Sequence, residues 1–302
     1  MNTLSIDRIN ANDQRFCISY PLADPLLFTS IQRIGIVQPV ILLNASPFVV
    51  VTGFKRIEIA HQLGMKEIPY VTVDITEHEA LLSAIHDNIR RGLNLVEKAH
   101  ALERMLHLGF SREEMFDMQN ILGMNPHEKM LKMLITLAST EDSLKHFIVE
   151  RNLSLKNVDY LMRFEVSERA SIIDLLSSVH VTESSIREIL EILCLLKLKH
   201  DKLSSDNFPP SINSQDLIKN LKKMAYPILT SLHKKLQDIR HALALPPNID
   251  IKVDPFFEKE YIDIGIRAKN QEDINQALEK LHRLTDDGIL GRIFDLTKGN
   301  LR

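Results

Sequence analysis

Apolar residues change their spacing along the chain, from a mixture of strand and helix patterns to almost continuous helical periodicity. Three short apolar runs rich in β-branched residues, at 37–43, 48–51 and 70–75, predict strands. Apolar positions three and four residues apart predict helices over 25–34, over about 54–63 and from Glu77 to the region of Arg91. We therefore expect an α/β domain at the start of the chain.

Helix-start signals recur through the middle of the chain. Asn94 precedes LVEKA with Glu97 three positions on, and Ser111 precedes REE in the same pattern, so each pair predicts a capping box. Asn125-Pro126 predicts the start of the next helix, with proline at its first position. Further helices are expected at 141–150, 154–163, 167–178 and 182–198.

A polar segment with paired prolines, SSDNFPPSINS at 204–214, predicts a linker. Beyond it we expect one long helix over 215–244, kinked at Pro227, then strands at 249–253 and 261–268 and a helix capped by Asn270. A hairpin and helix of this size do not easily bury a core alone, so a dimerisation or protein-contact role is expected.

These patterns predict an α+β protein in three parts. Residues 1–92 form the α/β domain, 93–203 an all-helical domain, and 214–302 a long helix with a small αβ unit. Limited proteolysis is expected to cut first near 204–214.

Composition and charge narrow the classes of function. With 302 residues and 44% of them hydrophobic, the chain has room for two or three globular domains. It contains no apolar run of about 20 residues that would span a bilayer and no signal-peptide layout, and it has two distant cysteines, so a reducing cytoplasm is expected. The net charge of −3 argues against a protein that is basic over a whole domain.

The stretch 48–91 contains the residues with the clearest chemistry. Gly53 permits close approach of the backbone to a ligand, and Lys55 and Arg56 lie at the helix start that follows, where unpaired N–H groups attract anions. Asp87 and Asn88 supply oxygen ligands of the kind that magnesium accepts beside phosphate. From the residues alone, this is either a phosphate site or a βαβ piece with solvated charges, since no complete P-loop is present.

Four segments resemble, in order and spacing, the successive boxes of the ParB family. They are GIVQP at 35–39, TGFKR at 52–56, LGMKEIP at 63–69 and HDNIRRGLNLVEKA at 86–99. The resemblance extends over roughly residues 3–200 and implies a ParB/sulfiredoxin-like N-terminal domain that binds CTP with magnesium. The chain departs from the family at Phe54-Lys55-Arg56, where Glu-Arg-Arg is usual, and at Asp87 and Arg90, where Glu and Gln are usual.

Carried onto this sequence, the resemblance gives a candidate site. Asp87 and Asn88 are the candidate magnesium ligands. CTP is the expected nucleotide, with another nucleoside triphosphate as the alternative, and weak CTP hydrolysis stays open. The candidate nucleotide-binding residues are Gln38, Thr52, Gly53, Phe54, Lys55, Arg56, Asn88, Arg90 and Arg91.

The helices on either side of Gly123 have the outline of a helix-turn-helix, which the family also has. The candidate DNA-contacting residues are Asn125, His127, Lys129 and Lys132. Acidic residues on the same helices, among them Glu113, Glu114, Asp117 and Glu128, oppose DNA contact. The lysine-rich helix at 215–244 is either a solvated face or a second contact with the phosphate backbone.

Together these features favour a ParB-like, nucleotide-dependent DNA-binding protein of the chromosome-partition type, in which the nucleotide acts as a clamp switch. The expected partners are DNA, a second copy of the chain as a homodimer, and a partition ATPase, with no membrane. The alternative is a ParB-fold regulator or phosphotransferase-like enzyme without DNA contact, for which Asp74 and Glu77 are the nearby candidate bases. The sequence contains no GxSxG or HExxH motif.

Overall fold

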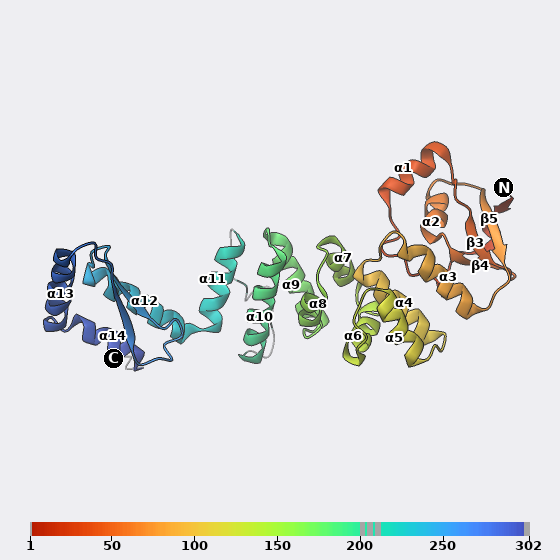
Figure 1. Ribbon diagram of the computed structural model, residues 1–302. Coiled ribbons are helices and arrows are strands. Elements are labelled where there is room, and N and C mark those ends of the chain that lie inside the picture. Colours follow the sequence, from red (N-terminus) through yellow and green to blue (C-terminus); the bar gives the residue numbers. More distant parts are fainter. Residues whose placement is uncertain (1, 200–202, 204–207, 209–212, 299–302) are drawn as a thin grey trace. The chain divides into compact units, whose positions relative to one another are not determined.

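A computed structural model describes residues 2–199, 203, 208 and 213–298 (Figure 1). The chain divides into two compact units. The first contains residues 1–190 and 202–206, and the second contains residues 191–201 and 207–302. Most of the predicted linker at 204–214 lies outside the described residues, and the division into three domains stays a prediction.

A five-stranded mixed sheet forms the framework of the first part of the chain. Its strands lie in the order β1-β5-β3-β4-β2, with β5 parallel to β3, β4 parallel to β2, and the other two pairings antiparallel. A short 3-10 turn, Ile6–Arg8, separates the first two strands. The strands are β1 (Thr3–Ser5), β2 (Ile9–Asn10), β3 (Val40–Leu43), β4 (Phe48–Thr52) and β5 (Glu67–Val73).

Three helices pack around this sheet: α1 (Pro25–Ile34), α2 (Phe54–Gln62) and α3 (Glu77–Ile89). Ile31 of α1 and Ile57 of α2 share a buried cluster with Val40 and Leu42 of β3 and Val50 of β4. Helix α3 packs against β4 and buries its own apolar positions. Both α2, whose Ile57 shares a cluster with Val50, and α3 are therefore positioned against β4.

The predicted strand starts need two corrections. The strand expected from residue 37 begins at Val40, because Pro39 lacks an N–H group to pair. The strand expected to follow Pro69 instead begins at Glu67, and Pro69 lies within it opposite Thr3 of the short strand β1. Proline is tolerated there because β1 covers only three residues of β5.

Seven helices follow in order, and the described part of 93–199 contains no strand. The capping boxes predicted at Asn94–Glu97 and Ser111–Glu114 are both present. The predicted helix start at Asn125-Pro126 is wrong, because α6 begins at Glu128 with His127 as its N-cap. The helices are α4 (Leu95–His107), α5 (Arg112–Ile121), α6 (Glu128–Ala138), α7 (Asp142–Glu150), α8 (Leu155–Leu161), α9 (Val166–Ser178) and α10 (Glu183–Lys199).

The C-terminal unit contains two helices where one long helix was predicted. The chain leaves the helical conformation at Tyr226 (φ −130°, ψ 62°), because the following residue is Pro227, which disfavours helical geometry in its predecessor. A final helix, α14, was also missed. The elements are α11 (Ser214–Ala225), α12 (Pro227–Leu243), β6 (Ile249–Val253), β7 (Ile262–Ile266), α13 (Gln271–Asp286) and α14 (Ile289–Thr297).

Antiparallel strands β6 and β7 form a separate two-stranded sheet in this unit. One side of the hairpin and the apolar stripes of α12 and α14 enclose a small core that includes Leu236, Leu243, Ile251 and Ile293. Among the described residues, no helix has both the length and the apolar character that crossing a membrane requires.

Candidate functional site

Most of the candidate nucleotide-binding residues lie around one hollow in the first unit. Its volume is about 460 Å³, which is within the range of small-molecule sites. Its walls come from the segment before α1, the turn between β4 and α2, and the end of α3. The lining residues are Ser19, Asp24, Leu27, Gln38, Gly53, Phe54, Lys55, Arg56, Asp87, Asn88, Arg90 and Arg91.

Gly53 makes the turn from β4 into α2 possible. Its φ of +104° and ψ of 19° lie in a region that L side chains rarely adopt. A Cβ atom at this position would lie 2.8 Å from Cγ1 of Val40 and 3.1 Å from Nε and Nη2 of Arg56. Glycine therefore keeps this wall of the hollow open beside the N-terminus of α2, whose first N–H groups favour an anion.

Lys55 and Asp24 form an ion pair inside the hollow. The lysine Nζ lies 3.2 Å from Oδ2 of Asp24, and both side chains are partly buried. Asp24 is also the N-cap of α1, where its Oδ1 accepts the N–H of Leu27 at 3.1 Å. Burial alone would raise the pKa of Asp24, but the Leu27 N–H and the Lys55 ammonium outweigh it and lower that pKa below its ordinary value.

Arg56 holds a second positive charge in a more buried position. Its Nη1 donates to the main-chain carbonyl of Gln38 at 3.2 Å. Burial lowers the pKa of Arg56, and the nearby carboxylate of Asp87 acts in the opposite direction. Because a guanidinium keeps its proton in proteins, Arg56 presents a charged fork with donors in addition to the one that Gln38 uses.

The end of α3 brings Asn88, Arg90 and Arg91 to the same hollow. The Oδ1 of Asn88 accepts from Nε and Nη2 of Arg91 at 3.1 and 2.9 Å. Arg91 also donates to Oε1 and Oε2 of Glu97 at 2.5 and 3.0 Å, and the Glu97 side chain is only 1% exposed. Arg91 thus joins the hollow to a buried carboxylate at the start of α4.

Glu97 collects further hydrogen bonds at this junction. Its carboxylate accepts the backbone N–H of Tyr20 and of Asn94, both at 3.1 Å. The Asn94 side chain donates to the carbonyl of Tyr20 at 2.7 Å. The segment next to the hollow and the first turn of α4 are therefore held together through one buried anion.

The protein side chains of the hollow cannot hold a magnesium ion alone, so a bound ligand would have to supply further oxygen atoms. Asp87 is exposed and lines the hollow, whereas Asn88 already uses its amide in bonds to Arg91 and to the carbonyl of Ala84. Within the described residues, no group of three His, Cys, Asp or Glu side chains is arranged to hold a metal. Such a site suits magnesium bound mainly by phosphate oxygens and water, with one protein carboxylate.

The structure brings most of the predicted nucleotide and magnesium residues together. Thr52 differs, because it is buried within β4 and does not line the hollow. Sequence reasoning missed Ser19, Asp24 and Leu27 as lining residues. The motif Asp24-Pro25 marks a helix start in the sequence, but only the fold places that cap beside Lys55.

The predicted DNA-contacting residues lie on and before α6. Asn125 is exposed in the turn, and His127 caps the helix by accepting the N–H of Lys129 at its Nδ1, 3.1 Å away. Both lysines face carboxylates: Nζ of Lys129 lies 3.7 Å from Asp159, and Nζ of Lys132 lies 3.5 Å from Glu128. The positive charge of this helix is therefore largely balanced within the protein.

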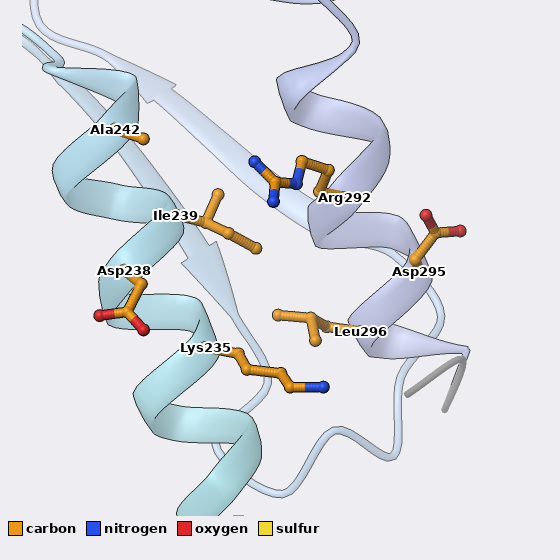
Figure 2. Close-up of a pocket in the computed structure, with 7 residues that line it drawn as sticks. All are labelled: Lys235, Asp238, Ile239, Ala242, Arg292, Asp295 and Leu296. Atoms are coloured by element: carbon orange, nitrogen blue, oxygen red, sulfur yellow. The ribbon is translucent and has the colours of Figure 1, made fainter. Parts of the chain in front are cut away.

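Another hollow, of about 340 Å³, lies between α12 and α14 in the C-terminal unit (Figure 2). Ile239 and Leu296 point toward each other from the two helices, and Lys235 and Arg292 reach into the same space. Asp238 and Asp295 complete a lining in which positive and negative charges balance. With one charge of each sign from each helix, it does not concentrate charge as the first hollow does.

The amino-acid sequence matches one known protein family and several individual proteins. Residues 2–89 match the family described as ParB N-terminal domain. The chain is also similar to two proteins named probable chromosome-partitioning protein ParB. That of Coxiella burnetii is 28% identical over 171 residues, which are 48% of this chain and 59% of the relative. That of Vibrio cholerae is 23% identical over 199 residues, which are 65% of this chain and 64% of the relative. The chain thus spans about three fifths of the length of these relatives.

Among solved structures, the chain aligns with a C-terminally truncated chromosome-partitioning protein ParB from Caulobacter crescentus, crystallised with CTP-γ-S. The two are 17% identical, and the alignment covers 63% of this chain and 98% of that one with a TM-score of 0.27.

Proposed function

Because residues 2–89 form a domain of the ParB N-terminal family, we propose that this chain is a nucleotide-dependent, DNA-binding partition protein. The nucleotide is CTP bound with magnesium, held in the hollow between the start of α2 and the end of α3. The two curated relatives, both named as chromosome-partitioning proteins, support the partition role.

The observation that carries the proposal is the gathering of four cationic side chains around a cavity of suitable size. Lys55 and Arg56 come from one end of α2, and Arg90 and Arg91 from the end of α3. Four cations against the two lining carboxylates of Asp24 and Asp87 leave the surface with a net positive charge, which favours an anion that carries more than one charge. The open backbone at Gly53 allows a phosphate to approach the N–H groups of α2.

The protein groups then have distinct roles. The guanidinium of Arg56 and the ammonium of Lys55 bind phosphate oxygens, while Asp87 holds the magnesium ion from the other side of the hollow. Bound magnesium neutralises part of the phosphate charge. Gln38, exposed at the rim, is placed to contact the base or sugar.

A nucleotide switch requires a ligand that binds two states of the protein with different affinity. We propose that the two states differ at the junction between the hollow and α4. There Arg91, which would lie next to the phosphates, also pairs with the buried Glu97 of α4. In the second state, two copies of the chain form a homodimer that closes as a clamp. A partition ATPase is a further partner of the chain in this proposal.

One observation favours the alternative of a ParB-fold regulator or enzyme without DNA contact. The lysines of α6 that would contact phosphates are paired with Asp159 and Glu128, and Arg112 also lies 2.5 Å from Glu128. DNA must therefore compete with carboxylates of the protein itself for these cations.

Gel-shift titrations over a range of salt concentrations separate the two functions. A DNA-binding protein loses affinity steeply as salt rises, because each phosphate contact releases a counterion. We expect binding to duplex DNA at low salt, and weaker binding by a Lys129→Ala, Lys132→Ala variant. Lys66→Ala serves as the control, because Lys66 is an exposed lysine of the sheet domain, outside α6, that does not line the hollow. Absence of binding to any duplex at low salt, with or without CTP and magnesium, would support the alternative.

A further inference from the structure

Asp24 places a negative charge inside the hollow that is otherwise built to attract phosphate. Its Oδ2 lies 3.2 Å from Nζ of Lys55, and the positive charge of Arg91 also acts on it, as the lowered pKa of the carboxyl indicates. A carboxylate here is not needed to cap α1, because asparagine and serine accept the same N–H bond from Leu27. Capping of α1 therefore does not account for the negative charge of Asp24, and we look for its function in the hollow.

We propose that Asp24 is a counter-anion that holds Lys55 before nucleotide binds and increases the dependence of nucleotide binding on magnesium. This inference rests on the proposed nucleotide function. A phosphate oxygen that binds the ammonium of Lys55 must displace the carboxylate of Asp24. After this exchange, the phosphate and Asp24 lie close together as two anions.

The cost of that encounter depends on the net charge that the ligand carries. A metal-free triphosphate brings its full negative charge next to both Asp24 and Asp87, which line the same hollow. Like charges in close contact repel strongly in a partly buried site. A magnesium-bound triphosphate has two fewer negative charges, so the displaced carboxylate repels it less. Asp24 thus disfavours the metal-free ligand more than the magnesium complex.

In the part of the chain that the structure describes, the other three cations of the hollow form no ion pair with a carboxylate that lines it, although Asp87 acts on Arg56 without forming one. Arg56 donates to the carbonyl of Gln38, a neutral acceptor, and Arg91 pairs with Glu97, which does not line the hollow. Among the ion pairs of the described residues, that of Lys55 and Asp24 is the one whose two members both line this hollow. Removing the charge of Asp24 is therefore the direct way to test the role.

The experiment is calorimetric titration of the full chain with CTP, in excess magnesium and in EDTA, for wild type and Asp24→Asn. Asparagine keeps the cap of α1, and Asp24→Ser provides a second variant that also caps helices. Asp7→Asn is the matched control, because Asp7 is an exposed aspartate of the same sheet domain that does not line the hollow.

We expect Asp24→Asn to tighten CTP binding in EDTA by at least about threefold and in magnesium by less than about twofold, as the loss of one partly exposed competing charge implies. The affinity in magnesium divided by the affinity in EDTA therefore falls, so CTP binding depends less on magnesium. Asp7→Asn leaves this ratio at the wild-type value.

Three results would overturn the proposal, and they are distinguishable. Equal affinities for wild type and both Asp24 variants would mean that Asp24 only caps α1. Weaker binding confined to the magnesium titration would make Asp24 a metal ligand instead of a counter-anion. If neither wild type nor variant binds CTP in either buffer, the nucleotide function itself fails, and the role of Asp24 fails with it.

Discussion

At the scale of single residues, the hollow depends on a glycine that is constrained both by its backbone conformation and by its neighbours. Gly53 has a positive φ, and a Cβ there also approaches Val40, a fully buried residue of β3. Gly64, just beyond the end of α2, has a positive φ of 66° but open space around the corresponding Cβ position. An L residue tolerates the φ of Gly64, which lies in the left-handed region, better than the φ of Gly53, 104°, so both the backbone term and the steric term are larger at Gly53.

We predict that Gly53→Ala lowers the free energy of unfolding by about 2–4 kcal/mol, since backbone strain and overpacking add. Gly64→Ala should cost about 1 kcal/mol, from the backbone term alone. Urea unfolding followed by circular dichroism measures both. Equal losses for the two variants would show that the contact with Val40 is relieved by a small shift of the chain.

Asp87 gives a prediction about the metal. It is exposed at the end of α3, so Asp87→Ala should leave the unfolding free energy within about 0.5 kcal/mol of wild type. The same change should reduce the difference between CTP affinity in magnesium and in EDTA, because the proposed protein ligand of the ion is lost, and should leave the part of that difference that comes from Asp24. A magnesium dependence equal to that of wild type would exclude Asp87 from the metal site.

At the scale of elements, the first turn of α4 is stabilised by a charge at the hollow. Glu97 is buried, and Arg91 is its cationic partner. We predict that Arg91→Ala lowers the unfolding free energy by about 3 kcal/mol, because it leaves a buried carboxylate without its cation. Arg90→Ala, the control at the neighbouring exposed position, should change it by less than about 0.5 kcal/mol. Thermal and urea unfolding of the two variants test this, and similar small losses for both would contradict the role of the pair.

Local signals predicted many elements well. The capping boxes at Asn94 and Ser111 are present. Both partners of each box lie within one helical turn, so the sequence alone is enough to predict the interaction. The start of α6 was placed too early, because a proline at a helix start competes with His127, whose ring accepts the N–H of Lys129. The break at Tyr226 was expected only as a kink, since sequence spacing alone does not distinguish a bent helix from two helices.

The candidate site was predictable only in part, for a physical reason. Its motif residues come from segments with recognisable turns and charges, such as Gly53 before Lys55 and Arg56. The pairing of Asp24 with Lys55 joins residues 31 positions apart, and that of Tyr20 with Glu97 joins residues 77 apart. Contacts of this kind are set by the packing of the sheet and helices, which no local pattern specifies.

At the scale of the whole molecule, the two compact units give a prediction about proteolysis. They meet in sequence within residues 191–207, next to the polar, proline-containing segment at 204–214. We expect limiting trypsin or subtilisin to cut first in or next to this segment and to leave a fragment of about the first 200 residues that keeps CTP binding. Mass spectrometry of the early fragments identifies the cut. First cleavage within 48–91 would contradict the division.

The central claim is that the hollow between α2 and α3 binds a nucleoside triphosphate. The most direct measurement is calorimetric titration of the wild-type chain with CTP, ATP, GTP and UTP in magnesium, alongside Arg56→Ala. We predict that CTP binds best, and that Arg56→Ala weakens its binding by about ten- to a hundredfold, as expected for loss of a charge-assisted hydrogen bond. If the wild-type chain binds none of the four nucleotides, or if Arg56→Ala binds CTP as tightly as wild type does, the account of the site is contradicted.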